Sequence, residues 1–336
     1  MVDASASAKK LFINDEQELR SGWRVIAYCL LFFVLVTVIW ILVGLMRVLI
    51  PALGRLLGQE VSGDETAGSG LVSMGISQSI LLVSALGATW VCARILEQRS
   101  FGSVGFRLHK GWLRDFGVGG IGGAITLSLA VGIASLAGGS RFWAGGASVS
   151  STLKWCWIPF GLFLISAAWE EAMLRGFPFQ ALLHNLGPVV AVTITSVIFG
   201  ILHLGNRDVT AMSTINTVLA GVWLGVAYLK TRSLWLATAL HLGWNFSTAF
   251  VFGLPVSGIT SLSQQPLLSV TAGGPVWLTG GNYGPEGGVA ATIALAVSTL
   301  VIWKTRLFTA SEEMKAATRH GSRRVVSRST DRGSQP

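Results

Sequence analysis

Two adjacent glutamates, Glu170 and Glu171, end an apolar run over residues 155–169 and are followed one helical turn later by Arg175. A carboxylate at membrane depth costs about 2.5–3.5 kcal/mol on insertion scales, so two neighbouring ones indicate a function. Helical spacing puts Glu171 beside Arg175, whereas Glu170 points about 100° away around the helix. Arg175 can therefore hold Glu171 ionised and fixed, which leaves Glu170 to face a cavity and act as a base.

Two later apolar segments carry further polar groups. His203 ends one of them, and a lone histidine at such a place is more often a packed or interfacial residue than a ligand. His241 and Asn245 lie four residues apart on one face of another segment, where each costs free energy unless it has a polar partner. A carboxylate, two imidazoles and an amide together contain what amide hydrolysis requires, namely a base for water and donors for an oxyanion. The alternative is that the charges around Glu170 are simply solvated at a helix end.

The same residues leave open whether a metal takes part. A catalytic zinc usually has three protein ligands and a water, and His203, His241 and a glutamate such as Glu170 would supply a His2Glu set. The chain has no His-Glu-x-x-His element, which weakens the case for zinc at the level of motifs. In the metal-free arrangement Glu170 and His203 activate water, while His241 and Asn245 donate to the oxyanion. A divalent metal such as zinc is thus a possible cofactor.

The elements that must position these residues are membrane helices. Of the 336 residues, 51% are hydrophobic and only 12% are charged, against about 25% in average soluble domains. Charge-poor stretches long enough to cross about 30 Å of hydrocarbon predict an all-α, multi-pass transmembrane bundle of about eight helices. The expected helices span residues 23–46, 71–93, 116–137, 155–174, 188–204, 210–229, 233–252 and 288–303.

The net charge of +9 is distributed as a topology signal. Of the 25 Lys and Arg residues, 20 fall on the side of the predicted helices that holds both termini, so both termini are predicted to be cytoplasmic. The basic excess also attracts anionic lipid head groups, and it lacks the aromatic interleaving of a nucleic-acid-binding surface. Membrane lipids are therefore expected partners and nucleic acid is not. Since no retention or peroxisomal signal closes the chain, the plasma membrane is the expected location.

Three regions follow along the chain: a polar cytoplasmic segment over 1–22, the membrane domain over 23–303, and a basic tail over 304–336 that is expected to be disordered. An outer loop over 253–287 is rich in Gly, Pro, Ser and Thr and has Glu286 as its only charge. We expect this loop to dip into the interface or to fold over the helices. Glycines cluster in two segments, at 117, 119, 120, 122 and 123 and at 221 and 225, and predict close helix packing.

The ordered set Glu170-Glu171-x-x-x-Arg175, Phe199-x-x-x-His203 and His241-x-x-x-Asn245 resembles the CPBP intramembrane protease family. This is the group of CAAX-processing endopeptidases and bacteriocin-immunity proteins also called Abi. The likeness covers about residues 155–245, within a core of the membrane domain at about 155–250, and is weaker in the basic stretch before the third helix. It implies a multi-helix membrane endopeptidase with its site in a cavity within the bilayer. Whether this endopeptidase is a metalloprotease is left open by the resemblance. Some members cut prenylated C-terminal CaaX tails.

By the same resemblance, Glu170 with His203 activates water, and His241 with Asn245 forms the oxyanion site. Glu171 and Arg175 then support them. The leading hypothesis is a peptidase that cleaves a membrane-associated or lipidated protein or peptide from a cavity facing the cytoplasm. The alternatives are a non-catalytic membrane scaffold or bacteriocin-immunity factor, in which the polar cluster holds helices together, and a secondary transporter. Transport is not supported by any evident inverted repeat between the halves of the chain.

The predicted helix limits conflict with this site in one respect. They place Glu170 near the cytoplasmic end of its helix and His203 near the outer end of the next. The two side chains would then be far apart. The conflict disappears if the fourth helix continues as a partly buried stretch through residues 179–183, or if the fifth helix starts late and is tilted.

Overall fold

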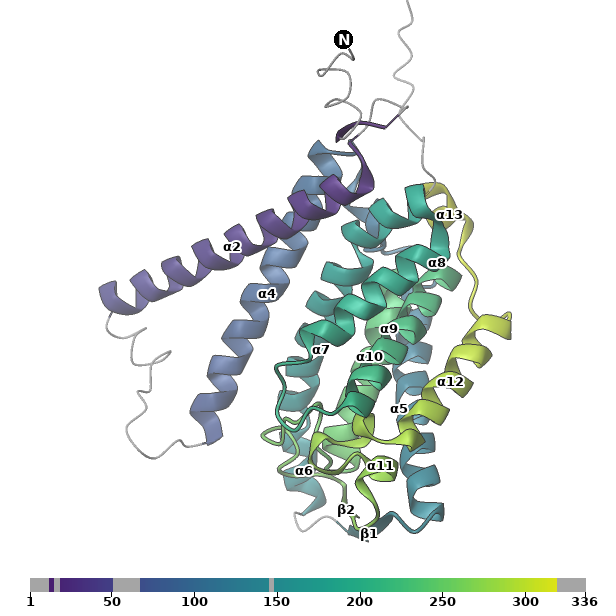
Figure 1. Cartoon of the computed structure of the whole chain (residues 1–336). Helices are drawn as coiled ribbons and strands as arrows, with labels where there is room; N and C mark the ends of the chain where they lie inside the picture. Colours follow the sequence, from purple (N-terminus) through teal and green to yellow (C-terminus); the bar gives the residue numbers. More distant parts are fainter. Residues whose placement is uncertain (1–11, 15–18, 51–66, 145–147, 319–336) are drawn as a thin grey trace, which may run out of the picture.

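A computed structural model describes residues 12–14, 19–50, 67–144 and 148–318 of the chain. These residues form a bundle of helices, and each of the eight predicted segments is helical (Figure 1). The main helices are α2 (Ser21–Leu49), α4 (Ala67–Ile95), α5 (Trp112–Leu136), α7 (Trp157–Arg175), α8 (Phe177–Leu202), α9 (Ala211–Thr231), α10 (Leu234–Phe246) and α12 (Val289–Lys304).

Within the described residues, five helical segments are long and apolar enough to cross a membrane: Ser21–Leu49, Gly70–Ile95, Trp112–Leu136, Ser150–Leu202 and Ala211–Thr231. The fourth of these joins α7 and α8 with the short helix α6 (Val149–Trp155) that precedes them. α10 has 13 residues and α12 has 16, which is fewer than the roughly 20 that a perpendicular crossing requires. The part of the chain that the structure describes therefore has five candidate spans rather than eight, and the number of actual crossings stays a prediction.

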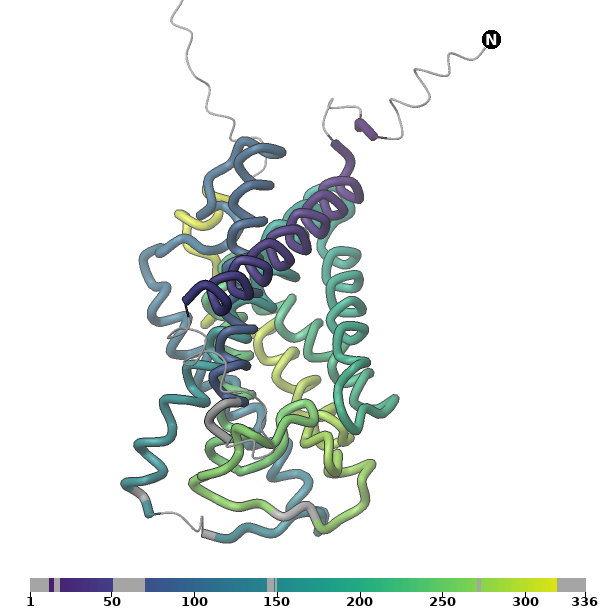
Figure 2. The backbone as a smooth tube through the Cα atoms, turned by 90° about the vertical axis from the view of Figure 1, so that its left-hand side faces the viewer, coloured from purple at the N-terminus to yellow at the C-terminus, as the bar shows by residue number. Residues whose placement is uncertain are grey.

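The helix α2 exposes an apolar surface. Leu30, Phe33 and Ile41 of α2 each expose more than 60% of their surface, although they are among the most apolar side chains of the protein. α2 leaves the bundle at an angle in Figure 1 and crosses its outside in Figure 2. Contiguous exposed apolar surface of this kind marks a membrane or protein contact, and hydrocarbon is the solvent that accommodates it.

One face of the bundle gathers the beginning of α2 and the end of the described chain. Glu97, which follows α4, accepts hydrogen bonds from Arg24 of α2 at 3.0 Å and from Arg99 at 3.4 Å. Arg99 also donates to the carbonyl of Ala317 at 3.2 Å, in the helix α13 (Glu312–Thr318). α13 packs Met314 completely out of solvent, beside the 3-10 turn η1 (Phe101–Val104).

Part of the basic tail thus differs from the prediction of disorder over 304–336. Glu312–Thr318 is helical because its apolar Met314 finds a buried site that the local sequence does not reveal. Residues 319–336 of the tail, and most of the predicted segment 1–22, lie outside the described residues.

The opposite face carries the loop over 253–287, which folds over the ends of the helices (Figure 1). It contains β2 (Leu268–Ala272), α11 (Val276–Thr279) and the turns η3 (Gly281–Tyr283) and η4 (Pro285–Gly287). β2 pairs antiparallel with β1 (Ser140–Ala144), with Phe142 opposite Val270. This two-stranded sheet was not predicted, since strands of five residues beside glycines give too short an alternation to detect.

Glycines set the closest helix contact of the bundle, between α5 and α10. A Cβ atom on Gly123 would lie 2.1 Å from the carbonyl oxygen of Leu240, and one on Gly243 would lie 2.1 Å from that of Gly120. Only glycine allows such an approach of two backbones. The glycine cluster predicted to serve packing therefore fixes the position of α10, which carries His241 and Asn245.

Candidate active site

The polar residues of α7 and those at the end of α8 meet because the chain turns back later than predicted. α8 begins at Phe177, directly after α7, and bends at Gly187, whose φ of +81° favours glycine and which precedes Pro188. Gly187 comes 17 residues after Glu170 and 16 residues before His203. The two side chains therefore lie at similar distances along the chain from the bend. This removes the conflict between helix limits and site.

Glu171, Arg175 and His241 form a buried polar chain. Arg175 donates to Glu171 Oε1 at 3.0 Å and to the carbonyl of Gly221 at 2.9 Å, and both charged side chains are 0% exposed. His241 Nδ1 donates to the same Glu171 Oε1 at 3.3 Å. Buried charges are stable only when paired and hydrogen-bonded, so this chain locks the ring of His241 in one orientation.

Glu170 is held differently, as the helical spacing predicts. Ser166 lies one turn earlier on α7 and donates its hydroxyl to Glu170 Oε1 at 2.9 Å. Glu170 Oε2 is buried, makes no hydrogen bond within the described part of the chain, and lies 3.8 Å from His241 Nε2. One carboxylate oxygen is thus anchored, while the other remains able to accept a proton.

His203 has a defined tautomer. Its Nδ1 lies 2.8 Å from the carbonyl oxygen of Phe199, and because a carbonyl can only accept, Nδ1 carries the hydrogen. In the neutral ring Nε2 then holds a lone pair. The Phe199 ring packs edge-on against His203 and His241 with centroid separations of 4.6 Å and 5.9 Å, and Arg175 lies 5.0 Å from its centroid.

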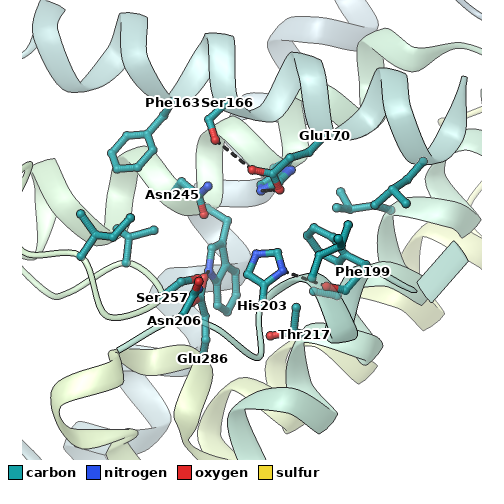
Figure 3. A pocket seen from close by; sticks show the side chains of 18 of the residues that line it. Phe163, Ser166, Glu170, Phe199, His203, Asn206, Thr217, Asn245, Ser257 and Glu286 are labelled. Atoms are coloured by element: carbon teal, nitrogen blue, oxygen red, sulfur yellow. Dashed lines mark hydrogen bonds and ion pairs between the residues drawn. The ribbon is translucent and has the colours of Figure 1, made fainter. Parts of the chain in front are cut away.

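A single cavity of about 240 Å³ is lined by Glu170, His203, His241 and Asn245. Figure 3 shows Glu170 at one end, His203 and Asn245 in the middle, and Glu286 at the other end. The amide of Asn245 is 7% exposed and forms no hydrogen bond in the described chain. The structure thus brings together the four residues for which catalytic roles were predicted. Glu171 and Arg175 lie behind them in the protein interior.

Two further residues of the cavity wall were not predicted. Ser166 precedes Glu170 by four residues, the same spacing that related Glu171 to Arg175, so the sequence did hold a signal for it. Glu286 comes from the 253–287 loop, more than 40 residues after the last motif, and only the fold brings it to the cavity. Its position as the sole charge of that loop was the one available indication.

The proposed His2Glu set fits a metal poorly in this structure. No group of three His, Cys, Asp or Glu side chains close enough to hold a metal ion occurs among the residues that the structure describes. Both nitrogens of His241 face carboxylate oxygens, of Glu171 at 3.3 Å and of Glu170 at 3.8 Å. A histidine ligand must offer an unprotonated nitrogen to the metal, whereas this environment favours a ring that donates protons.

Residues 151–247 match a family model described as Rce1-like, type II CAAX prenyl endopeptidase. The chain carries a domain of the Rce1-like family. All six predicted site residues fall within this Rce1-like domain, and α7 to α10 form nearly all of it. The family is described as one of CAAX prenyl endopeptidases, and the match covers less than a third of the chain. Among curated proteins and solved structures no significant match to the chain was found.

Proposed function

We propose that the chain is a membrane-embedded endopeptidase that hydrolyses a peptide bond of a membrane-associated or lipidated protein. The observation that carries the proposal is the convergence of Glu170, His203, His241 and Asn245 on one cavity inside an Rce1-like domain. The cavity contains a base, Glu170, whose Oε2 accepts no hydrogen bond from the described residues, and the imidazole of His203. It also contains two hydrogen-bond donors. These are the parts that amide hydrolysis needs.

In the proposed reaction Glu170 Oε2 removes a proton from a water molecule, whose second hydrogen is held by His203 Nε2. The oxygen of this water attacks the carbonyl carbon of the scissile peptide. The anchored contacts of Glu170 with Ser166 and of His203 with Phe199 aim both groups without freedom to rotate away. The proton held by Glu170 then passes to the departing amine as the C–N bond breaks.

The negative oxygen of the tetrahedral intermediate is stabilised by the opposite wall. Asn245 offers an amide N–H that has no other partner in the described residues, and His241 offers Nε2–H. Glu171 and Arg175 hold the His241 ring in place from behind. Donors that are fixed before the reaction stabilise developing charge without reorganisation, which typically contributes a factor of about 100–1,000 to the rate.

We further propose that the enzyme resides in the plasma membrane with both termini in the cytoplasm, as the distribution of Lys and Arg predicts. The loop-lined end of the cavity lies on the face opposite to α13 and to the beginning of α2 (Figure 1). In this orientation that end faces the outer side rather than the cytoplasm. This changes the expected direction of the cavity, while the residue roles stay as proposed.

The test compares peptide termini in membranes of cells that make the wild-type chain or Glu170→Gln at equal inserted levels. We expect termini that appear only with the wild type, because the amide side chain cannot accept the proton of water. Glu312→Gln is the matched control, since the side chain of Glu312 is 89% exposed on α13 and should leave every terminus unchanged. Identical termini for wild type and Glu170→Gln would favour the scaffold or immunity factor.

A further inference from the structure

The loop end of the cavity is formed by a carboxylate that lies outside the family-matched segment. Glu286 belongs to the turn η4, and its two oxygens accept hydrogen bonds from separate elements. Trp244 Nε1 of α10 donates to Oε1 at 3.0 Å, and the hydroxyl of Ser257 donates to Oε2 at 2.5 Å. Two donors on two oxygens suit the ionised, acceptor-only form of the side chain.

The backbone around Glu286 is fixed just as firmly. Asn216 of α9 donates its amide to the carbonyl oxygens of Glu286 at 2.8 Å and Gly288 at 2.9 Å. Thr292 of α12 in turn donates to Asn216 Oδ1 at 2.7 Å. Two helices, α9 and α10, therefore hold Glu286 directly, and α12 supports Asn216. The carboxylate lies at the cavity wall on the opposite side from Glu170 (Figure 3). These hydrogen bonds fix both the backbone and the side chain of Glu286, whereas fixing the loop over the helices needs only its backbone contacts.

The carboxylate of Glu286 has no partner of opposite sign among the residues that the structure describes. No ion pair forms to Glu286 in the described chain, and no Lys or Arg is among the residues that line the cavity. The lining holds two glutamates, Glu170 and Glu286, and two histidines. A partly buried carboxylate without a counter-charge attracts cations and repels anions.

We propose that Glu286 forms a subsite for a cationic group of the peptide substrate, the ammonium of a lysine or the guanidinium of an arginine. The inference rests on the proposed function, because it assumes that the occupant is a peptide. It also predicts that the free carboxylate at the end of a substrate chain is disfavoured at this end of the cavity. The subsite thus selects for a basic residue displaced from the scissile bond towards the loop.

A metal ion is a poorer occupant of the same place. Both oxygens of Glu286 already accept hydrogen bonds, and its neighbours Trp244 and Ser257 present donors. A divalent cation needs several oxygen or nitrogen ligands, and the described residues supply no such group. An ammonium or guanidinium requires only one or two further acceptor sites on the carboxylate, which each oxygen still has.

The test compares the residues around the cleaved bonds in membranes that contain wild type, Glu286→Gln or Glu312→Gln. Only the peptide termini that depend on Glu170 are used. With the wild type and with Glu312→Gln, Lys and Arg should be enriched at one fixed position near the cleaved bond. In Glu286→Gln the preference for basic over neutral residues at that position should fall about tenfold or more, because the charge is lost while the shape remains.

A second measurement needs no variant of the enzyme. In a substrate that the wild type cleaves, replacing the basic residue by Gln should lower the cleavage rate by a similar factor. Wild-type termini without basic enrichment, or an unchanged preference in Glu286→Gln, would overturn the subsite while leaving the peptidase intact. If no terminus depends on Glu170, the proposed function fails and this subsite with it, so the two failures are distinguishable.

Discussion

Arg175 is the residue on which the buried charges depend. It is fully buried, pairs with Glu171, donates to the carbonyl of Gly221 and lies over the ring of Phe199. In Arg175→Leu the buried carboxylate of Glu171 would lose its guanidinium partner and keep only the longer contact with His241 at 3.3 Å, so we expect a loss of about 3–5 kcal/mol in the free energy of unfolding. Denaturation of the purified chain in detergent micelles measures this loss.

The double variant Glu171→Gln with Arg175→Leu serves as the control for that prediction. It removes both charges and should recover part of the stability, since a neutral pair needs no compensation in the interior. Arg175→Leu with wild-type stability would mean that Glu171 is protonated or solvated rather than held by Arg175.

The two imidazoles also carry a prediction about metal. Because both nitrogens of His241 face carboxylates, we expect the purified chain to contain much less than one metal ion per molecule. Activity should survive removal of metal by chelators, and metal analysis together with the cleavage rate checks both points. A stoichiometric zinc whose removal abolishes cleavage would restore the His2Glu set of His203, His241 and a glutamate.

At the scale of elements, the contact between α5 and α10 places half of the site. Gly123 touches the backbone of Leu240, one residue before His241, so a methyl group there must push the helices apart. We expect Gly123→Ala to destabilise the protein by about 1–3 kcal/mol and to lower cleavage further by displacing His241 and Asn245. Thermal unfolding and the cleavage rate test this expectation.

The same helix provides its control. A Cβ atom on Gly132 of α5 would meet nothing within 4 Å, so Gly132→Ala should keep stability and cleavage near wild type. Equal behaviour of the two alanine variants would contradict the view that the glycines at residues 120–123 set the position of α10.

Helices with long hydrophobic runs could be predicted from the sequence. Elements whose formation depends on tertiary contacts could not. α5 and α9 differ from their predicted limits by a few residues, because apolar spans are marked by the absence of charge. The predicted helices end at residue 174 and resume at residue 188, with a continuation through residues 179–183 as one alternative. Proline is tolerated in the first turn of a helix, and α8 begins already at Phe177.

The residues of the candidate site also differ in whether the sequence could predict them. Glu170, His203, His241 and Asn245 could be found because polar groups are conspicuous in apolar segments. Glu286 could not be assigned, since its partners Trp244 and Asn216 lie 42 and 70 residues away in the sequence. The distance between motifs in the chain carries no information about such a contact.

At the scale of the whole molecule, the protein has one face with cationic side chains around Glu97 and α13 and another covered by the 253–287 loop. The Rce1-like domain lies between them, and its cavity extends to the loop. If the termini are cytoplasmic, a substrate reaches Glu286 from the outer side or within the bilayer. With this geometry, a peptidase would act on proteins of which at least a part lies on the outer side of the membrane or within the bilayer.

The central claim is that this chain itself breaks the peptide bond, and purified protein in liposomes tests it most directly. Wild type, Glu170→Gln, His203→Ala and Glu312→Gln would each be reconstituted with a substrate identified from the Glu170-dependent termini. The account predicts cleavage at the same bond by the wild type and Glu312→Gln, and none by the other two. Folded wild-type protein that leaves the substrate intact, or Glu170→Gln that cleaves it at the wild-type rate, would contradict the account.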